Sequence, residues 1–253
     1  MGKKIAIVNQ KGGVGKSTTA VNLGAGLAEI GKKVLLIDLD PQGNASSGLG
    51  VEKSELEFTT YDLLIEAESA STAIMETETD NLDLIPANIE LAGAEIELVS
   101  IMSRESRLKK SLGEVNNHYD YIIIDCPPSL GLLTLNALTA ADSVMVPIQC
   151  EYYAMEGLGQ LMNTIELVRK NLNSDLRIEG VLMTMYDART NLSEQVIEEV
   201  EDYFSDLMFK TIIPRNVRLS EAPSFGQTIS KYDSSSRGAK AYKKLAEEVK
   251  NDG

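Results

Sequence analysis

The sequence predicts an α/β protein built on a single doubly wound, mostly parallel sheet with helices on both faces. Short runs rich in Ile, Val and Leu alternate along the chain with longer amphipathic runs. Strands of this kind are typical of a parallel sheet that helices cover on both sides. The 253 residues contain no internal repeat and no low-complexity linker. Because this length can bury one full-sized core, we expect a single domain over residues 1–253.

Seven apolar runs are the expected strands of this sheet. In chain order they cover residues 5–9, 33–40, 82–87, 119–127, 143–149, 178–186 and 210–214. Four amphipathic runs are the expected helices, and they cover residues 17–31, 130–142, 156–172 and 192–204. The first of these ends on Gly31, a residue type that commonly follows a helix. The acidic, irregular stretch 51–80 is interpreted as an insertion on the same domain.

Composition excludes several classes of protein. With 43% apolar and 25% charged residues, the chain is globular rather than disordered. No segment approaches the roughly 20 apolar residues of a membrane span, and the start, "MGKKIAIVNQ", has too short an apolar run for a signal peptide. Cys126 and Cys150 lie in apolar runs without CxxC spacing, which predicts buried, reduced thiols. We therefore expect a cytoplasmic protein.

The stretch "IVNQKGGVGKST" (7–18) departs in one place from a phosphate-binding loop. The pattern G-x-x-x-x-G-K-[ST] requires a glycine six residues before Lys16, and Gln10 stands there, followed by a second lysine, Lys11. The loop otherwise has the right setting, because it follows an expected strand and begins an expected helix. It is therefore interpreted as a nucleotide-binding loop whose additional lysine needs its own explanation.

Each part of this loop has an expected chemical task. Backbone N–H groups at the start of a helix converge on phosphate oxygens, and glycines let the anion approach closely. The residues that supply them are Gly12, Gly13, Val14, Gly15, Lys16, Ser17 and Thr18. The Lys16 ammonium is placed to pair with the β and γ phosphates, and the Ser17 hydroxyl to ligate Mg²⁺.

Three aspartates stand where expected strands end. "LLIDLD" contains Asp38 and Asp40, and "YIIIDCPPS" contains Asp125. Since parallel strands end at one edge of the sheet, where ligands bind, these carboxylates should gather near the loop. Asp125 follows an apolar run and is expected to organise Mg²⁺ through its water shell. Asp38 and Asp40 point the same way if the strand is still extended, whereas a turn between them would separate their roles.

Positive charge is concentrated near the end of the chain, although the net charge of the whole is −14. Between residues 207 and 246 only Glu221 and Asp233 are acidic, against eight basic residues. A local patch of this kind can bind phosphate backbones even on an acidic molecule. The basic residues are Lys210, Arg215, Arg218, Lys231, Arg237, Lys240, Lys243 and Lys244.

Several motifs together resemble the deviant Walker A ATPases, and within them the ParA/Soj chromosome-partitioning family. The first three are "KGGVGKST" with Lys11, "DLDPQGN" (38–44) and "YIIIDCPPSLG" (121–131). The resemblance continues through "QCEYYAMEGL" (149–158), "DARTNL" (187–192) and "IPRNVRLSEAPSFG" (213–226). It therefore runs almost from end to end, and it implies the fold of P-loop NTPases.

The resemblance implies an ATP-dependent cycle. ATP would bind with Mg²⁺ and drive formation of a homodimer that sandwiches two nucleotides. Lys11 matches the family's signature lysine, which reaches the phosphates of the partner subunit, and Asp40 matches the residue needed for attack by water. With Lys16, these residues form the expected catalytic set. Hydrolysis is expected to be slow.

The same resemblance assigns further site residues. Asp38 and Asp125 match the metal-side carboxylates, beside Ser17. Pro214 and Asn216 match positions that line the adenine.

The family also binds DNA without sequence specificity, outside the nucleotide cleft. Arg189 and Arg218 lie in motifs where the family carries DNA-contacting residues, and Lys240, Lys243 and Lys244 of the basic window are further candidates. A ParB-type, centromere-bound partner is implied to stimulate hydrolysis and return the protein to the monomer. The protein is accordingly expected to associate with the nucleoid.

Three other classes of protein remain open. A membrane-associated positioning ATPase resembling MinD would need a C-terminal amphipathic helix, whereas "KKLAEEVKNDG" lacks a bulky apolar stripe. An electron-transfer protein like the nitrogenase iron protein would need cysteines that bridge a cluster between subunits, and Cys126 stands instead at the end of a buried run. A metabolic ligase or synthetase would need a pocket for a second substrate, which no further set of polar residues indicates.

Overall fold

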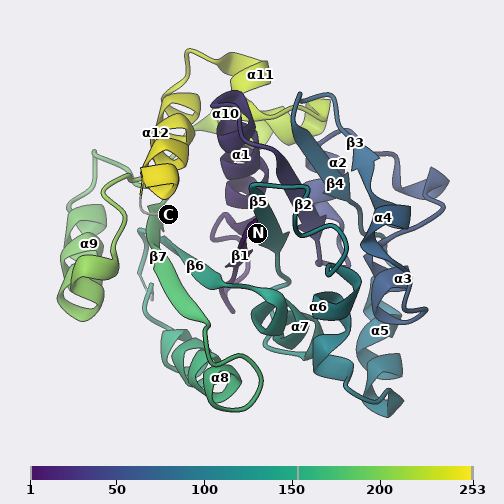
Figure 1. Ribbon diagram of the computed structural model, residues 1–253. Coiled ribbons are helices and arrows are strands. Elements are labelled where there is room, and N and C mark those ends of the chain that lie inside the picture. Colours follow the sequence, from purple (N-terminus) through teal and green to yellow (C-terminus); the bar gives the residue numbers. More distant parts are fainter. Residues whose placement is uncertain (1, 153, 252–253) are drawn as a thin grey trace.

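A seven-stranded sheet in the order β3-β4-β2-β5-β1-β6-β7 forms the centre of the computed structural model, which describes residues 2–152 and 154–251 (Figure 1). The strands are β1 (Lys3–Ile7), β2 (Val34–Asp38), β3 (Met75–Glu76), β4 (Leu82–Ile85), β5 (Tyr121–Asp125), β6 (Ser143–Gln149) and β7 (Arg177–Thr184). All neighbouring strands run parallel except β3 and β4, which are antiparallel. The predicted fold class is confirmed.

Helices connect the strands and cover both faces of the sheet (Figure 1). The longer ones are α1 (Lys16–Glu29), α7 (Leu132–Ala140), α8 (Leu158–Asn171), α9 (Asn191–Phe204) and α12 (Arg237–Asn251). The shorter ones are α2 (Asn44–Gly48), α3 (Thr60–Leu64), α4 (Ala70–Ala73), α5 (Leu91–Glu97), α6 (Arg107–Ser111), α10 (Val217–Glu221) and α11 (Ile229–Asp233). Short 3₁₀ turns are η1 (Lys53–Glu55), η2 (Leu98–Ser100), η3 (Arg104–Ser106), η4 (Ser205–Leu207) and η5 (Ala222–Phe225).

Successive side chains of each inner strand serve two different cores. In β5, Ile122 and Ile124 belong to the core covered by α7 and α8, whereas Ile123 belongs to the core covered by α1 and α12. All three are fully buried, because successive residues of a strand point to opposite faces. This explains why the strands read as continuous apolar runs.

The last helix, α12, packs its apolar face against α1. Leu245, Ala246 and Val249 are fully buried, and a Cβ atom at Gly26 would lie 3.0 Å from the Ala246 Cβ atom. The C-terminal segment therefore has an apolar stripe, and that stripe forms part of the core. Among residues 2–152 and 154–251, no helix is long and apolar enough to cross a membrane.

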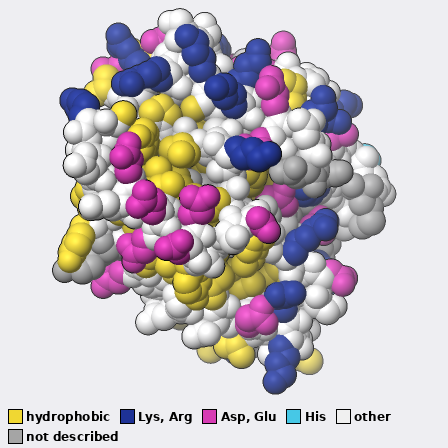
Figure 2. Space-filling view, turned by 90° about the vertical axis from the view of Figure 1, so that its left-hand side faces the viewer, with side chains coloured by type: hydrophobic (Ala, Val, Ile, Leu, Met, Phe, Trp, Pro, Cys, Tyr) yellow, Lys and Arg dark blue, Asp and Glu magenta, His cyan; other side chains and the backbone are white. Residues whose placement is uncertain are grey.

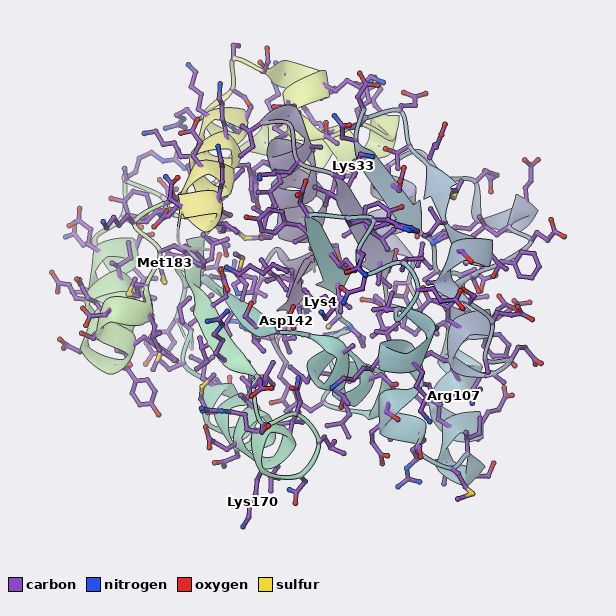
Figure 3. All side chains as sticks on the ribbon, in the orientation of Figure 1. Lys4, Lys33, Arg107, Asp142, Lys170 and Met183 are labelled. Carbon is purple, nitrogen blue, oxygen red and sulfur yellow. The ribbon has the colours of Figure 1, made fainter. Side chains whose placement is uncertain are left out.

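Polar contacts hold neighbouring strands together at the edge of the sheet where the strands begin. The Lys4 backbone N–H donates to Asp142 Oδ2 over 2.8 Å, and its ammonium lies 3.0 Å from the same oxygen. Figure 3 shows the two residues close together. Since Lys4 is on β1 and Asp142 immediately precedes β6, this contact sets the start of both strands.

Two sequence-based expectations were wrong. Residues 210–214 do not form a strand: they run beside β7 with an isolated bridge between Tyr186 and Pro214. Proline has no N–H group to donate to a ladder, and the neighbouring contacts are single bonds, such as Ile213 N–H to the Met183 carbonyl over 2.9 Å. The stretch 51–80 is also more ordered than expected, since it contains η1, α3, α4 and the edge strand β3.

Candidate nucleotide-binding site

The loop between β1 and α1 leaves a row of backbone N–H groups without partners. Gly13 and Gly15 adopt positive φ angles of 75° and 90°, conformations that favour glycine. None of the N–H groups from Gly12 to Thr18 donates to another described residue, and the next, that of Thr19, begins the helix by donating to the Gly15 carbonyl. A Cβ atom at Gly12 or Gly13 would meet nothing within 4 Å. Such open, convergent donors at a helix start suit an anion.

Two buried side chains hold this loop against the sheet. Asn9 donates through Nδ2 to the Pro147 carbonyl over 2.7 Å and accepts from the Lys11 N–H over 2.9 Å. Thr184, at the end of β7, donates through Oγ1 to the Val14 carbonyl over 2.8 Å. Neither residue was predicted from the sequence to hold the loop, although each is a polar residue in or directly after an apolar run.

The two lysines of the loop differ in environment. Lys16 is only 6% exposed, and its ammonium donates to the Lys11 carbonyl over 3.2 Å. Burial lowers the pKa of Lys16, while the nearby Asp125 carboxylate opposes this effect. The Lys11 side chain is partly exposed, and its ammonium makes no hydrogen bond or ion pair within the described part of the chain.

Asp38 and Asp125 face each other across neighbouring strands at the edge where these strands end. Both are fully buried. Burial raises the pKa of Asp125 well above its ordinary value, and the Asp38 carboxylate raises it further. Burial also raises the pKa of Asp38 to about 6, although hydrogen bonds from Ser46 N–H and Oγ to Asp38 Oδ2, at 2.8 and 2.7 Å, oppose the rise.

Asp38 and Asp40 have separate surroundings. β2 ends at Asp38, and the chain then turns, so Asp40 lines the cavity beside the loop while Asp38 does not. Asp40 Oδ1 accepts from the Gln42 N–H over 2.9 Å. Both Asp38 oxygens are already engaged, because Oδ1 accepts from the Asp40 N–H over 3.1 Å. Of the two arrangements that the sequence left open, the structure has the separated one.

The Asp125 carboxylate fits a site beside a bound cation. Neither of its oxygens has a hydrogen-bond partner of ordinary geometry in the described part of the chain, which is rare for a buried carboxylate. No group of three or more His, Cys, Asp or Glu side chains among residues 2–152 and 154–251 could hold an ion alone. Mg²⁺ suits such a place, since it usually keeps several waters and shares substrate phosphates.

The cavity beside the loop has two adjoining parts. Its first part, about 440 Å³, is lined by Lys16, Ser17 and Asp40 among others. Its second part, about 570 Å³, is lined by Pro214 and Asn216. The two parts share the side chains or backbone of Gly15, Thr18, Met185 and Pro223. The structure thus brings the loop and the expected adenine-side residues to one continuous hollow, whereas Lys11, Val14, Asp38 and Asp125 do not line it.

The candidate DNA-binding arginines do not line this hollow, although the neighbours of Arg218, Val217 and Leu219, do. Arg189 is highly exposed and pairs with Asp187 through two hydrogen bonds of 2.8 and 2.6 Å, which hold the pKa of that carboxyl well below its ordinary value. Arg218, on α10, pairs with Glu221 over 2.8 Å and lies 3.7 Å from Asp233.

The candidate lysines lie on a different element. Lys240, Lys243 and Lys244 are exposed on α12. Figure 2 shows Lys and Arg side chains gathered across the upper part of the face where Figure 1 places α12, above a band of acidic side chains. The five candidate residues are therefore spread over the loop before α9, α10 and α12.

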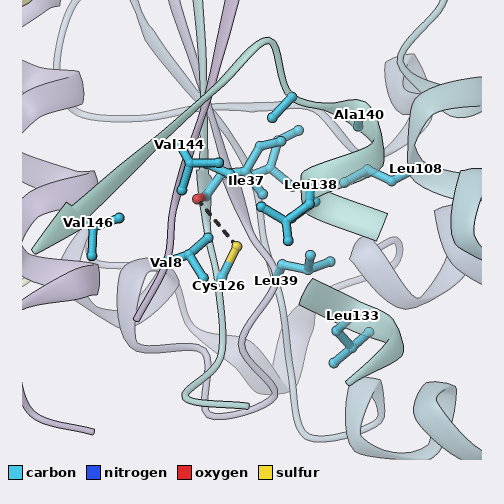
Figure 4. Packing of buried hydrophobic residues seen from close by; sticks show 14 of the residues in the cluster. Val8, Ile37, Leu39, Leu108, Cys126, Leu133, Leu138, Ala140, Val144 and Val146 are labelled. Carbon is cyan, nitrogen blue, oxygen red and sulfur yellow. Dashed lines mark hydrogen bonds between the residues drawn. The ribbon is translucent and has the colours of Figure 1, made fainter. Parts of the chain in front are cut away.

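Both cysteines are free and buried, as predicted. Cys126 is fully buried, and Figure 4 shows it beside Val8 and Leu39, with its thiol directed to the Ile124 carbonyl 3.8 Å away. Burial raises the pKa of the Cys126 thiol well above its ordinary value. A thiol in this position cannot reach a cluster shared with another subunit.

The fold, the loop and the hollow together define an ATPase domain of the P-loop class. The family model described as "AAA domain" matches residues 2–178. A solved structure of cobyrinic acid a,c-diamide synthase from Mycobacterium smegmatis, with a bound ATP analog and magnesium, is similar with a TM-score of 0.86 and 41% identity, covering 98% of this chain and 93% of that one.

Curated relatives narrow the class to a family. The chain is 66% identical to the sporulation initiation inhibitor protein Soj of Bacillus subtilis (strain 168), over 100% of both chains. It is 54% identical to the chromosome partitioning protein ParA of Myxococcus xanthus (strain DK1622), covering 98% of this chain and 88% of the relative. This chain therefore belongs to the ParA/Soj family of chromosome-partitioning ATPases.

Thr184→Val tests how the loop is held. The substitution keeps the shape of the side chain but leaves the buried Val14 carbonyl without its donor, so the free energy of unfolding should fall by about 1 to 3 kcal/mol. Urea denaturation measures the change. Thr164→Val is the matched control, because that hydroxyl donates to the Gln160 carbonyl at an exposed position on α8. Equal losses from both variants would contradict the assigned role of Thr184.

Proposed function

We propose that this protein is an ATP-driven dimerisation switch for DNA partitioning. In this proposal Mg²⁺-ATP binding produces a homodimer that binds double-stranded DNA without sequence specificity. Slow hydrolysis, stimulated by a ParB-type centromere-binding protein, returns the monomer. The observation that carries the proposal is the pair of unlike lysines in the loop, one buried beside the carboxylates and one partly exposed, with an ammonium that has no partner among the described residues.

Each nucleotide-site residue receives a task from its position. The Lys16 ammonium and the free N–H groups from Gly12 to Thr18 would hold the phosphates, and the ammonium would exchange its contact with the Lys11 carbonyl for a phosphate oxygen. The Ser17 hydroxyl and the Asp125 carboxylate would hold Mg²⁺ and its waters, and the bound ion would supply charge neutralisation. Pro214 and Asn216 line the far part of the hollow, which suits adenine.

Asp40 is placed to orient or deprotonate the attacking water. Its carboxylate lines the phosphate end of the hollow and is only 6% exposed. Asp38 would then act indirectly, because its bonds to Ser46 and to the Asp40 N–H fix the start of the turn that carries Asp40. A switch has to stay in its ATP-bound state before it hydrolyses ATP. We therefore expect an unstimulated rate of ATP hydrolysis well below about 10 s⁻¹.

The free Lys11 ammonium supports dimerisation through the nucleotide. Within one subunit it has no partner among the described residues. In a two-fold dimer each Lys11 would serve the phosphates of the other subunit, so one residue forms two reciprocal contacts.

Dimerisation would switch DNA affinity without any new contact within a subunit. A single basic patch binds DNA with a dissociation constant on the order of 10⁻⁴ to 10⁻⁶ M. Joining two patches makes the second contact intramolecular, and avidity adds roughly 10²- to 10⁴-fold. Arg189, Arg218 and the α12 lysines are the proposed contacts. The two arginines already pair with exposed or partly exposed carboxylates, which phosphates could replace.

The two nearest alternative functions are less well supported. A MinD-like membrane ATPase would need the apolar side of α12 for lipid, but Leu245, Ala246 and Val249 are buried against the rest of the chain. A synthase function rests on a structural relative at 41% identity, compared with 66% for Soj over the whole chain. Cytoplasmic, nucleoid-associated localisation follows from the favoured function.

DNA binding measured with ATP, with ADP and without nucleotide, at two salt concentrations, tests the proposal directly. ATP should raise the apparent affinity for random-sequence duplex by about 10²- to 10⁴-fold, and the affinity should fall steeply with salt. Fluorescence anisotropy of a labelled duplex measures both. Nucleotide-independent binding, or ATP-dependent flotation with liposomes instead, would contradict the proposal.

Lys11→Ala and Lys16→Ala should separate the two lysines. Removing the Lys16 ammonium takes a charge-assisted bond from the phosphates and should weaken ATP binding by about 10- to 100-fold. Lys11→Ala should bind ATP with near-normal affinity but stay monomeric. Calorimetry and size-exclusion chromatography with ATP provide the two readouts. A dimeric Lys11→Ala protein would show that Lys11 does not link the subunits.

Arg189→Glu should weaken DNA binding while ATP-dependent dimerisation stays intact. Loss of a phosphate contact lowers the slope of log affinity against log salt by about 1 per contact. Arg169→Glu is the matched control, since Arg169 is an exposed arginine on α8 that also pairs with a neighbouring carboxylate, Glu166. If dimerisation fails together with DNA binding, Arg189 serves the dimer rather than the DNA.

A further inference from the structure

A second hollow lies beside the turn that carries Asp40. It has a volume of about 610 Å³ and is lined by Pro41, Gln42, Glu52, Leu56, Ile89 and Glu90, among others. Gln42 lines both this hollow and the nucleotide cavity, so the two are separated only by the turn after Asp40. We name this second hollow the Gln42 groove.

One wall of the Gln42 groove is connected to Asp40 by two hydrogen bonds. The Lys53 ammonium donates to the Gln42 carbonyl over 2.8 Å, and the Gln42 N–H donates to Asp40 Oδ1 over 2.9 Å. The Lys53 stem also lies against Gly43, where a Cβ atom would be 2.7 Å from Lys53 Cδ. Lys53 and Asp40 therefore contact the same turn, one at the Gln42 carbonyl and the other at the Gln42 N–H.

The rim of the Gln42 groove is acidic. Two exposed glutamates line it, Glu52 and Glu90. The segment that forms one wall carries two more exposed glutamates, Glu55 and Glu57. Lys53 is the single cation that lines it among the described residues, and its ammonium is already bound to the Gln42 carbonyl. The charge of the groove therefore favours a cationic occupant.

Apolar side chains continue from the groove along α5. Ile89 lines the groove and is 68% exposed. Ile96 and Val99, on α5 and η2, are 78% and 60% exposed, and their spacing of three residues places them on the same side of the helix. An occupant should therefore carry apolar as well as basic side chains.

We propose that the Gln42 groove and the exposed side of α5 dock a basic, partly apolar segment of the partner that stimulates hydrolysis. This inference rests on the proposed function. The docked segment would compete with Lys53 for its place on the turn and so change the position of Asp40 relative to the phosphates. The partner would then stimulate ATP hydrolysis without entering the nucleotide cavity.

The double variant Ile89→Asp/Glu90→Lys tests this docking site. The matched control is Leu167→Asp/Glu166→Lys on α8, an adjacent apolar and acidic pair in which Leu167 is 62% exposed. The probe is the purified ParB-type protein of the same organism, titrated in the presence of ATP and duplex DNA. The readouts are unstimulated ATP turnover, ATP-dependent DNA binding and the partner concentration that gives half-maximal stimulation.

The Ile89→Asp/Glu90→Lys protein should keep normal unstimulated turnover and ATP-dependent DNA binding. Its half-maximal stimulation should require about tenfold more partner or beyond, while the α8 control behaves as the wild type. Stimulation equal to the wild type, or an equal loss in the control, would overturn the docking site. Loss of ATP-dependent dimerisation in the groove variant would also overturn it, because a second copy would then cover this face. A wild-type protein that the partner does not stimulate would refute the proposed function itself.

Discussion

Two buried carboxylates on neighbouring strands, Asp38 and Asp125, are the constraint on which the rest of this structure depends. Parallel strands end at one edge, so their last residues lie side by side whatever their charge. Burying two like charges costs free energy unless cations or donors compensate for them. Ser46 donors compensate for Asp38, whereas Asp125 has the Ser17 side chain and the Lys16 charge beside it but no hydrogen bond of ordinary geometry. The arrangement is complete only with a cationic ligand, and a ligand that binds the native state stabilises it by mass action.

The helix that begins at the phosphate loop, α1, contacts α12 at two places along its length. Thr19, one turn into α1, shares a buried hydrogen bond of 3.1 Å with the Tyr242 hydroxyl on α12. The close approach of Gly26 to Ala246 fixes the two helices further along. Because protein interiors are close-packed, these contacts hold α12 in a fixed relation to α1 and the nucleotide site. In the proposed function, a second subunit would therefore double the number of cations offered to DNA without a rearrangement inside either subunit.

The sequence predicted the parts of the site that depend on local pattern. Strands that end in aspartate and a glycine loop before a helix place Lys16, Ser17 and Asp40 at one hollow, as the structure has them. Long-range contacts could not be read in the same way: Thr184 reaches the loop from 170 positions away along the chain, and no periodicity marks it. Residues 210–214 satisfy the apolar pattern of a strand but include a proline, and their pairing with β7 remains a set of single bonds.

The acidity of the chain is compatible with the proposed DNA-binding switch. With a net charge of −14 the molecule as a whole repels DNA, while Lys and Arg side chains gather across the upper part of the face shown in Figure 2. Repulsion between exposed charges fades beyond about 8 to 10 Å at physiological salt, so only cations in direct contact with the phosphates contribute attraction. In the proposed function, a monomer with one such surface is released easily, and the free-energy difference between holding and releasing DNA comes from the number of subunits. The same acidity leaves the Gln42 groove attractive to a basic protein segment, so one charge distribution disfavours DNA on the groove side and favours a regulator there.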